Sequence, residues 1–171
     1  MAPLIGRADQ KGGDRIGRLW RGVETMLAAA IIVFVMAVPC RAQESEILAV
    51  LEAWSEIYAN SSDSAEMKAL YHPDAVFFGT GGLEPMLGLE AFGPYFQNQF
   101  DNFSDRDHAF IDPVIRFYGA GQIATATGLY RFIVTPTNGE DPIDVTYRYT
   151  LSLVSTDEGW LIIQHHSSQL P

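Results

Sequence analysis

The second half of the chain constrains the fold most, because four segments rich in β-branched and aromatic residues follow one another there. The segments are Ile111–Tyr118, Gln122–Thr135, Ile143–Ser155 and Trp160–Ser168. Turn sequences with glycine, such as Gly119-Ala120-Gly121 and Asp157-Glu158-Gly159, separate them. Because short glycine turns join neighbouring antiparallel strands, the pattern predicts a four-strand antiparallel meander.

Helical patterns come before these strands. Apolar residues recur on one face of a helix over Glu44–Asn60, and aromatic residues do so over Leu89–Asn102. A short helix over Ser64–Tyr71, capped by Ser62 or Asp63, and a short buried strand over Ala75–Gly79 lie between them. Helices followed by a bent sheet predict an α+β domain in which the helices cover one face of that sheet.

The first 42 residues have the composition of a signal peptide. Arg15, Arg18 and Arg21 form a basic flank before the uncharged apolar run Met26–Pro39, which is shorter than the roughly 20 residues that span a bilayer. Small residues then favour cleavage after Ala42, although an uncleaved anchor is the alternative. We therefore expect a signal peptide over 1–42 and one domain over 43–171, periplasmic or secreted, without stable membrane insertion after cleavage. Cleavage would remove the single cysteine of the chain.

The domain after the leader is strongly acidic. It holds five of the 11 Lys and Arg residues but 18 of the 21 Asp and Glu residues, so it is more negative than the whole chain at −10. Binding to phosphate backbones depends on Lys and Arg. We therefore expect no nucleic-acid partner.

Four stretches of the sequence resemble a known family. They are Leu70–Val76 (LYHPDAV), Ile115–Gly119 (IRFYG), Arg148–Thr150 (RYT) and Gly159–Pro171 (GWLIIQHHSSQLP). They resemble the bacterial relatives of the calcium/calmodulin-dependent protein kinase II association domain, a branch of the nuclear-transport-factor-2-like (SnoaL-like) superfamily in which some members are labelled SgcJ/EcaC-type oxidoreductases. The resemblance spans residues 44–171. It implies a cone in which the N-terminal helices pack in a curved, mainly antiparallel sheet around a cavity, and it implies self-association through the sheet.

The resemblance also implies a ligand pocket on the last strands. Arginines of the kinase association domain line a pocket for small carboxylates, and matching the C-terminal ends puts Arg131 and Ser167 at two of those places and Thr150 near a third. Arg148 lies two residues from Thr150 and shares its face of the strand. Arg131 and Arg148 are thus candidates for a bidentate clamp on an anionic or carbonyl ligand such as a carboxylate, with pairing to surface carboxylates as the alternative.

Two adjacent histidines, His165 and His166, occupy the last predicted strand. A histidine titrates near neutral pH and can transfer protons or bind metal. Neighbouring residues of a strand point to opposite faces, so at most one of the pair reaches a cavity and the two cannot chelate one ion. With no cysteine in the mature chain, we expect no metal site.

The remaining candidates are aromatic or acidic. Trp54, Tyr58, Phe96 and Tyr130 could line the cavity, although aromatic residues at such spacing are first of all core. Asp74 precedes a predicted strand, where it could also cap the backbone. If the protein is an enzyme, His165, Asp74 and Tyr58 are its candidate catalytic residues.

Together with the resemblance, these patterns predict an exported domain that binds a small organic molecule and self-associates, at least as a dimer, without kinase activity. A small pocket enzyme of the isomerase, cyclase or dehydratase type is one alternative, and a pure oligomerisation module is another. Hydride transfer is disfavoured because no dinucleotide-binding fingerprint is present, and we expect no cofactor.

Overall fold

The structure, a computed structural model, describes residues 41–171. The predicted signal peptide lies outside these residues, apart from its last two positions. A single helix runs over residues 41–60 and matches the predicted amphipathic helix. Its buried face carries Ile47, Leu51, Trp54 and Tyr58. No helix within residues 41–171 is both long and apolar enough to cross a membrane.

The short second helix is smaller than predicted. Helix α2 covers Ser64–Lys68, and the carboxylate of Asp63 caps it by accepting from the backbone N–H of Ala65 at 2.7 Å. Tyr71, predicted to end this helix, instead begins strand β1 (Tyr71–Phe78). The reason is tertiary: Tyr71 pairs with Ile162, which draws this segment into the sheet.

Helix α3 covers Leu89–Asn102, as predicted. It starts after Gly88, whose φ of 77° is readily accessible only to glycine. The two-residue strand β2 (Met86–Leu87) precedes it and pairs with β1.

The predicted meander is confirmed and forms most of a larger sheet. Its strands are β3 (Phe103–Tyr118), β4 (Ile123–Pro136), β5 (Ile143–Thr156) and β6 (Gly159–Gln169). The sheet order is β2-β1-β6-β5-β4-β3, with β1 parallel to β6 and all other neighbours antiparallel. The sheet is therefore mixed, six-stranded and open.

Strand β3 begins eight residues before the predicted strand. Residues 103–110 alternate between the two faces of the sheet, with His108 buried and Asp105 and Asp107 exposed. The inward positions include Arg106 and His108, which are polar, so no apolar alternation marked this segment as a strand.

A β-bulge in β6 decides which side chains face inward. Gln164 pairs with Ser152 and Ile162 pairs with Leu153, so Ile163 has no partner in β5. The extra residue shifts the alternation of faces. Ile162 is buried before the bulge, whereas His165 and Ser167 are buried after it and His166 is exposed.

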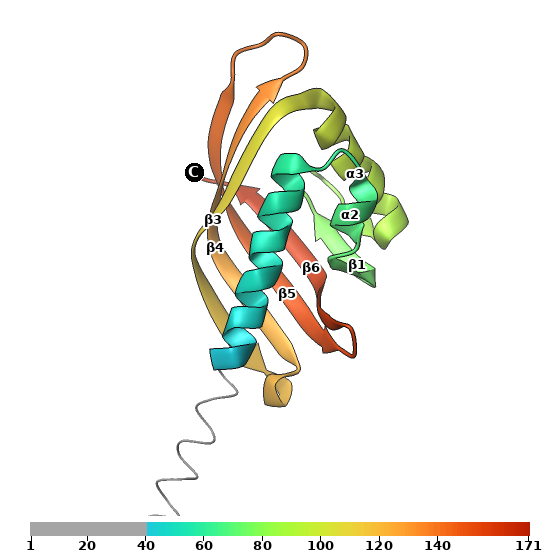
Figure 1. Cartoon of the computed structure of the whole chain (residues 1–171), viewed down its shortest axis with the longest axis vertical. Coiled ribbons are helices and arrows are strands. Elements are labelled where there is room, and N and C mark those ends of the chain that lie inside the picture. Colours follow the sequence, from blue (N-terminus) through green and yellow to red (C-terminus); the bar gives the residue numbers. More distant parts are fainter. Residues whose placement is uncertain (1–40) are drawn as a thin grey trace, which may run out of the picture. The chain divides into compact units, whose positions relative to one another are not determined.

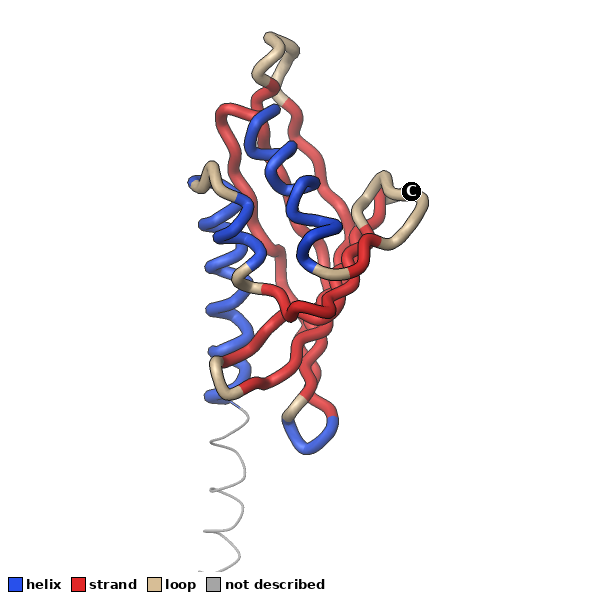
Figure 2. Tube along the Cα trace, turned by 90° about the vertical axis from the view of Figure 1, so that its right-hand side faces the viewer, coloured by secondary structure: helices blue, strands red, loops and turns tan. Residues whose placement is uncertain are grey.

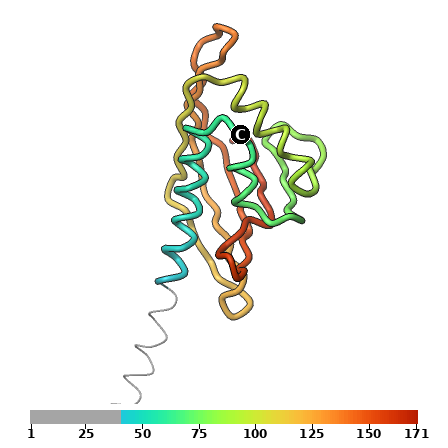
Figure 3. Tube along the Cα trace, turned by 45° about the vertical axis from the view of Figure 1, so that its right-hand side comes forward, coloured from blue at the N-terminus to red at the C-terminus, as the bar shows by residue number. Residues whose placement is uncertain are grey.

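The helices lie against one face of the bent sheet. Figure 1 shows the long helix lying on the sheet and running roughly along the strands, with α2 and α3 beside it. The quarter-turn view in Figure 2 shows how strongly the strands bend around these helices, and Figure 3 shows the long helix following β3. The core between the layers is rich in aromatic residues from the long helix, from α3 and from every long strand. This layering is the α+β cone that the sequence predicts.

Candidate functional site

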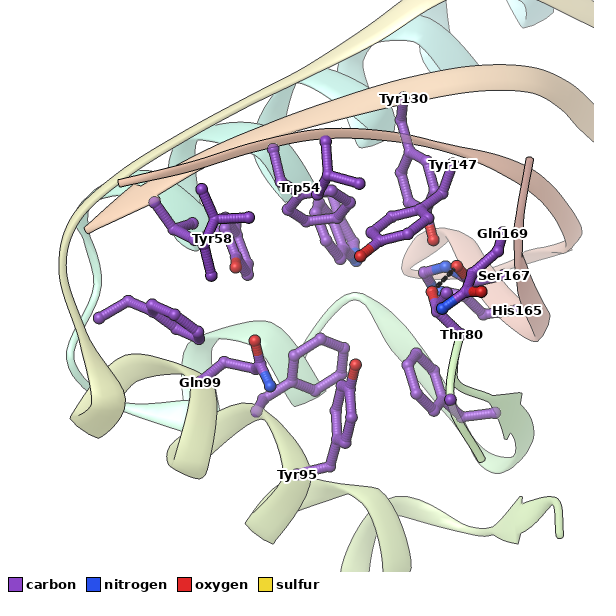
Figure 4. Close-up of a pocket in the computed structure, with 18 residues that line it drawn as sticks. Trp54, Tyr58, Thr80, Tyr95, Gln99, Tyr130, Tyr147, His165, Ser167 and Gln169 are labelled. Carbon is purple, nitrogen blue, oxygen red and sulfur yellow. Dashed lines mark hydrogen bonds between the residues drawn. The ribbon is translucent and has the colours of Figure 1, made fainter. Parts of the chain in front are cut away.

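A cavity of about 300 Å³ lies between the helices and the inner face of the sheet. The long helix contributes Trp54 and Tyr58, α3 contributes Tyr95 and Phe96, and the strands supply most of the rest (Figure 4). The other lining residues are Phe77, Thr80, Gly81, Gln99, Phe103, Tyr130, Phe132, Val134, Ile143, Val145, Tyr147, His165, Ser167 and Gln169.

No Asp, Glu, Lys or Arg is among these lining residues. The polar groups that line the cavity are hydroxyls, two carboxamides and one imidazole. Burial raises the pKa of Tyr58, Tyr95 and Tyr130, so these phenols stay neutral at physiological pH. The lining is therefore uncharged and largely aromatic.

His165 is held by a buried chain of hydrogen bonds. The indole Nε1 of Trp54 donates to the hydroxyl oxygen of Tyr71 at 2.9 Å, and that oxygen lies 2.8 Å from Nδ1 of His165. The other ring nitrogen of His165, Nε2, is buried and has no hydrogen-bond partner among the described residues. Burial, with a smaller effect of His166, lowers the pKa of His165 to about 3. The imidazole is therefore neutral at physiological pH.

A group of hydroxyls lies next to His165. Thr80 and Ser167 hydrogen-bond to each other through their side-chain oxygens (Figure 4). Tyr130 lies close enough for these two hydroxyls to offset part of the rise in its pKa. Together with His165, they form the polar end of the cavity.

Six of the nine predicted ligand-binding residues line this cavity: Trp54, Tyr58, Phe96, Tyr130, His165 and Ser167. The structure thus brings together residues from α3, the long helix and two strands. Of the candidate catalytic residues, Tyr58 and His165 line the cavity, whereas Asp74 is exposed on β1.

The other three predicted ligand residues, Arg131, Arg148 and Thr150, lie on the outer face of the sheet. The predicted arginine clamp on a cavity ligand is therefore not formed. Arg131 forms an ion pair with Asp144, and Nη2 of Arg148 donates to the carbonyl oxygen of Gln169 at 2.6 Å. The reason is the strand alternation: Tyr130, Tyr147 and Tyr149 take the inward positions of β4 and β5, so their neighbours face outward.

Thr150 and Arg148 do come together, with His166 and Ser168, in a shallow groove on that outer face. Arg131 and Thr150, two of the positions implied by the resemblance, thus lie on the face of the sheet away from the cavity, whereas Ser167 lies on the cavity side.

Sequence reasoning missed several lining residues and one buried histidine. Thr80, Tyr95, Gln99 and Tyr147 line the cavity; among these, Tyr147 could have been found from its place on the apolar face of β5. His108 packs between Trp54 and Phe132, and its Nδ1 lies 2.9 Å from Oγ of Ser55. Burial lowers its pKa to about 3. No local signal distinguished it from a surface histidine.

Possible metal ligands do not form a cluster within residues 41–171. No three His, Cys, Asp or Glu side chains of this part of the chain lie close enough together to hold an ion. His165 and His166 point to opposite faces, as their adjacency predicted.

Similarity to known proteins points to one family and one fold. A family model described as a SnoaL-like domain matches residues 47–171. No curated protein matches the chain. A solved structure from Xanthomonas campestris, named as a candidate calcium/calmodulin-dependent protein kinase II association domain, is 29% identical with a TM-score of 0.66, over 74% of this chain and 86% of that one.

Two more distant structures share the same fold. A nuclear-transport-factor-2-like superfamily protein from Salmonella enterica is 19% identical with a TM-score of 0.69, over 77% of this chain and 94% of that one. A candidate dehydratase of the same superfamily from Streptomyces avermitilis is 15% identical with a TM-score of 0.67, over 78% and 99% of the two chains. At these identities the likeness concerns the fold alone.

Proposed function

Because the chain belongs to the SnoaL-like domain family and has the nuclear-transport-factor-2-like fold, we propose that it uses its cavity to bind a small, neutral, largely aromatic molecule. The observation that carries this proposal is the uncharged lining of the cavity. An ionised ligand would lose its hydration there without gaining a counter-charge, which is costly. Flat apolar rings would instead pack against the aromatic walls.

A matched pair of ring compounds tests this proposal. We expect 2-acetylnaphthalene, which is neutral, to bind more tightly than 2-naphthoate, which has the same ring system but carries a carboxylate. Isothermal titration calorimetry measures both affinities. Tighter binding of the carboxylate, or no binding of either compound, would contradict the proposal.

A variant that fills the cavity separates binding inside it from binding elsewhere. Val145 lines the cavity, so Val145→Phe should abolish binding of 2-acetylnaphthalene. Thr150 lies on the same strand but faces outward, so Thr150→Val serves as the control and should bind normally. Equal binding by both variants would place the ligand outside the cavity.

Proton-transfer catalysis is the second candidate function. A cavity imidazole with one unpaired nitrogen favours it, and the Streptomyces neighbour is named as a candidate dehydratase. An efficient general base has a pKa near the working pH, however, whereas burial lowers the pKa of His165 to about 3. Binding without proton abstraction by His165 is therefore the better-supported function. Turnover that depends on a group of pKa near 7, lost in His165→Gln, would favour the enzyme instead.

Self-association through the outer face of the sheet belongs to the proposal as well. Three apolar side chains, Ile111, Val114 and Leu129, are exposed on that face. Burying such a patch in a dimer would remove it from water. Light scattering should report a dimer that Leu129→Lys weakens, whereas Leu83→Lys, at a side chain 93% exposed on a loop, should not. A monomeric protein, or a dimer indifferent to Leu129→Lys, would contradict this surface.

Export completes the proposed function and rests on the leader pattern alone. We expect the mature protein to begin at Gln43 and to occur in the periplasm or the medium. Mass spectrometry of the N-terminal peptide from a fractionated culture checks this, and an intact leader on cytoplasmic protein would contradict it.

A further inference from the structure

The hydrogen-bond chain behind the cavity fixes where the protons lie. The indole of Trp54 can only donate, so the hydroxyl oxygen of Tyr71 accepts its N–H. The hydrogen of that hydroxyl is then free for Nδ1 of His165, 2.8 Å away. In the reverse assignment Nδ1–H would donate to Tyr71, and the phenolic hydrogen would have no acceptor although Tyr71 is only 2% exposed. An unpaired buried donor is costly, so the first assignment is favoured.

This assignment determines the tautomer of His165. When Nδ1 accepts a hydrogen bond, the single hydrogen of a neutral imidazole sits on Nε2. That atom is buried and unpartnered among residues 41–171, and the ring itself lines the cavity (Figure 4). Buried donors in folded proteins are almost always paired, so an unpaired one calls for a partner.

We propose that Trp54 and Tyr71 lock His165 into the tautomer that offers Nε2–H to the cavity, and that this N–H selects ligands carrying a neutral oxygen acceptor, such as a ketone. The inference rests on the proposed binding function and adds the class of group that is recognised. Tyr71 is a positioning residue, because it does not line the cavity and acts through His165.

The chemistry of the site follows from this tautomer. A nitrogen that already carries a hydrogen cannot take up a proton, so Nε2 cannot abstract one from a ligand. It can donate a hydrogen bond to a carbonyl oxygen and thereby polarise the C=O bond. Thr80 and Ser167, next to the ring, can complete the contacts of the same oxygen.

The tautomer can be measured without any ligand. Two-bond ¹H–¹⁵N spectra of ¹⁵N-histidine-labelled protein distinguish a protonated ring nitrogen from an accepting one. We expect His165 to show Nε2–H in the wild type at neutral pH and to shift toward a mixture of tautomers in Tyr71→Phe. An Nδ1–H tautomer in the wild type, or unchanged His165 signals in Tyr71→Phe, would overturn the inference.

Two internal controls make this measurement specific. Tyr149 is also buried in the aromatic core, but its hydroxyl has no hydrogen-bond partner among the described residues, so Tyr149→Phe should leave the His165 signals unchanged. The hydrogen-bond partner of His108 Nδ1 is the hydroxyl of Ser55 and not Tyr71, so the His108 signals should not move in Tyr71→Phe. The wild-type spectrum decides the tautomer even if Tyr71→Phe folds poorly.

Selection for the acceptor is tested with two isosteric probes. 2-Isopropenylnaphthalene has a CH₂ group in place of the ketone oxygen of 2-acetylnaphthalene. One hydrogen bond predicts roughly fivefold to tenfold tighter binding of the ketone to the wild type and to Tyr149→Phe. In Tyr71→Phe the ratio should be about twofold lower, because only about half of the rings would then carry the hydrogen on Nε2. Equal affinities in the wild type would overturn the inference and leave the cavity as a binding site. Binding of neither probe would overturn the proposed function, while the spectra would still report the tautomer.

Discussion

The guanidinium group of Arg106 donates through Nε to the main-chain carbonyl oxygen of Tyr58 at 2.7 Å. The same group bonds the carbonyl oxygens of Ser61, Phe100 and Phe103. These carbonyls lie in the last turns of the long helix and of α3 or directly after them, where acceptors have no partner within the helix. One side chain of β3 thus joins the ends of the two helices that enclose the cavity.

We therefore expect Arg106→Met to be strongly destabilising. The variant leaves four helix-end carbonyls without their donor and removes a cation from two helix C-termini, at a cost of roughly 2–3 kcal/mol. Chemical denaturation measures this loss. Arg116→Met is the matched control, because within residues 41–171 the side chain of Arg116 bonds just the carbonyl oxygen of its neighbour Ile115. Equal effects of the two variants would contradict the structural role of Arg106.

The two buried histidines predict a pH dependence of stability. Burial lowers the pKa of both His108 and His165 from 6.5 to about 3. Between these values the unfolded chain binds protons that the folded chain does not, so the free energy of unfolding falls as the pH drops from 6.5 toward 3. Each histidine contributes about 1.4 kcal/mol per pH unit within that window.

Removing one of the two should flatten this dependence. We expect His108→Phe, which keeps an aromatic ring in the core, to lower the slope of unfolding free energy against pH by about 1.4 kcal/mol per unit. Parallel curves for the wild type and His108→Phe would show that His108 titrates normally.

The outward placement of the arginines gives a third prediction. Arg131 and Arg148 lie on the face of the sheet opposite the cavity, so Arg131→Gln and Arg148→Gln should bind 2-acetylnaphthalene as tightly as the wild type. Calorimetry on each variant checks this. A large loss of affinity in either variant, with the fold intact by circular dichroism, would bring the arginine clamp back into consideration.

A close approach in the sheet gives the fourth prediction. A Cβ atom on Gly128 would lie 3.1 Å from the carbonyl oxygen of Ile111 and 3.4 Å from Cε1 of Tyr149. Gly128→Ala should therefore destabilise the protein by roughly 1–3 kcal/mol. Gly81→Ala, where a Cβ atom would meet nothing within 4 Å, should change stability by no more than about 0.5 kcal/mol. Similar melting temperatures for the two variants would contradict the tight packing at Gly128.

Much of the fold was predictable because local patterns and tertiary packing agree there. The long helix and α3 follow from apolar residues at helical spacing, and the meander follows from β-branched segments bounded by glycine turns. The start of β3 was not predictable in this way, since its inward positions hold Arg106 and His108. Arg106 donates to main-chain carbonyls in and after the two long helices, and Nδ1 of His108 lies 2.9 Å from Oγ of Ser55. A strand pattern cannot reveal such partners.

The candidate site was predictable in its aromatic part. Trp54, Tyr58 and Phe96 follow from helix faces that must turn toward the sheet. The outward direction of Arg131 and Arg148 was not predictable from the resemblance. A resemblance assigns residues to positions along a strand, but it does not say which face of the sheet each side chain lies on. A shift of one residue moves a side chain to the other side of a sheet.

The sequence by itself determined the order of elements, the acidic surface and the presence of two adjacent histidines that face opposite ways. Only the tertiary structure decided which histidine faces inward. The alternation that buries Ile162 would also bury Gln164 and His166, but the unpaired Ile163 inserts one residue and turns His165 and Ser167 inward instead. A bulge depends on the register of the neighbouring strand, and register is a property of the assembled sheet rather than of any one segment.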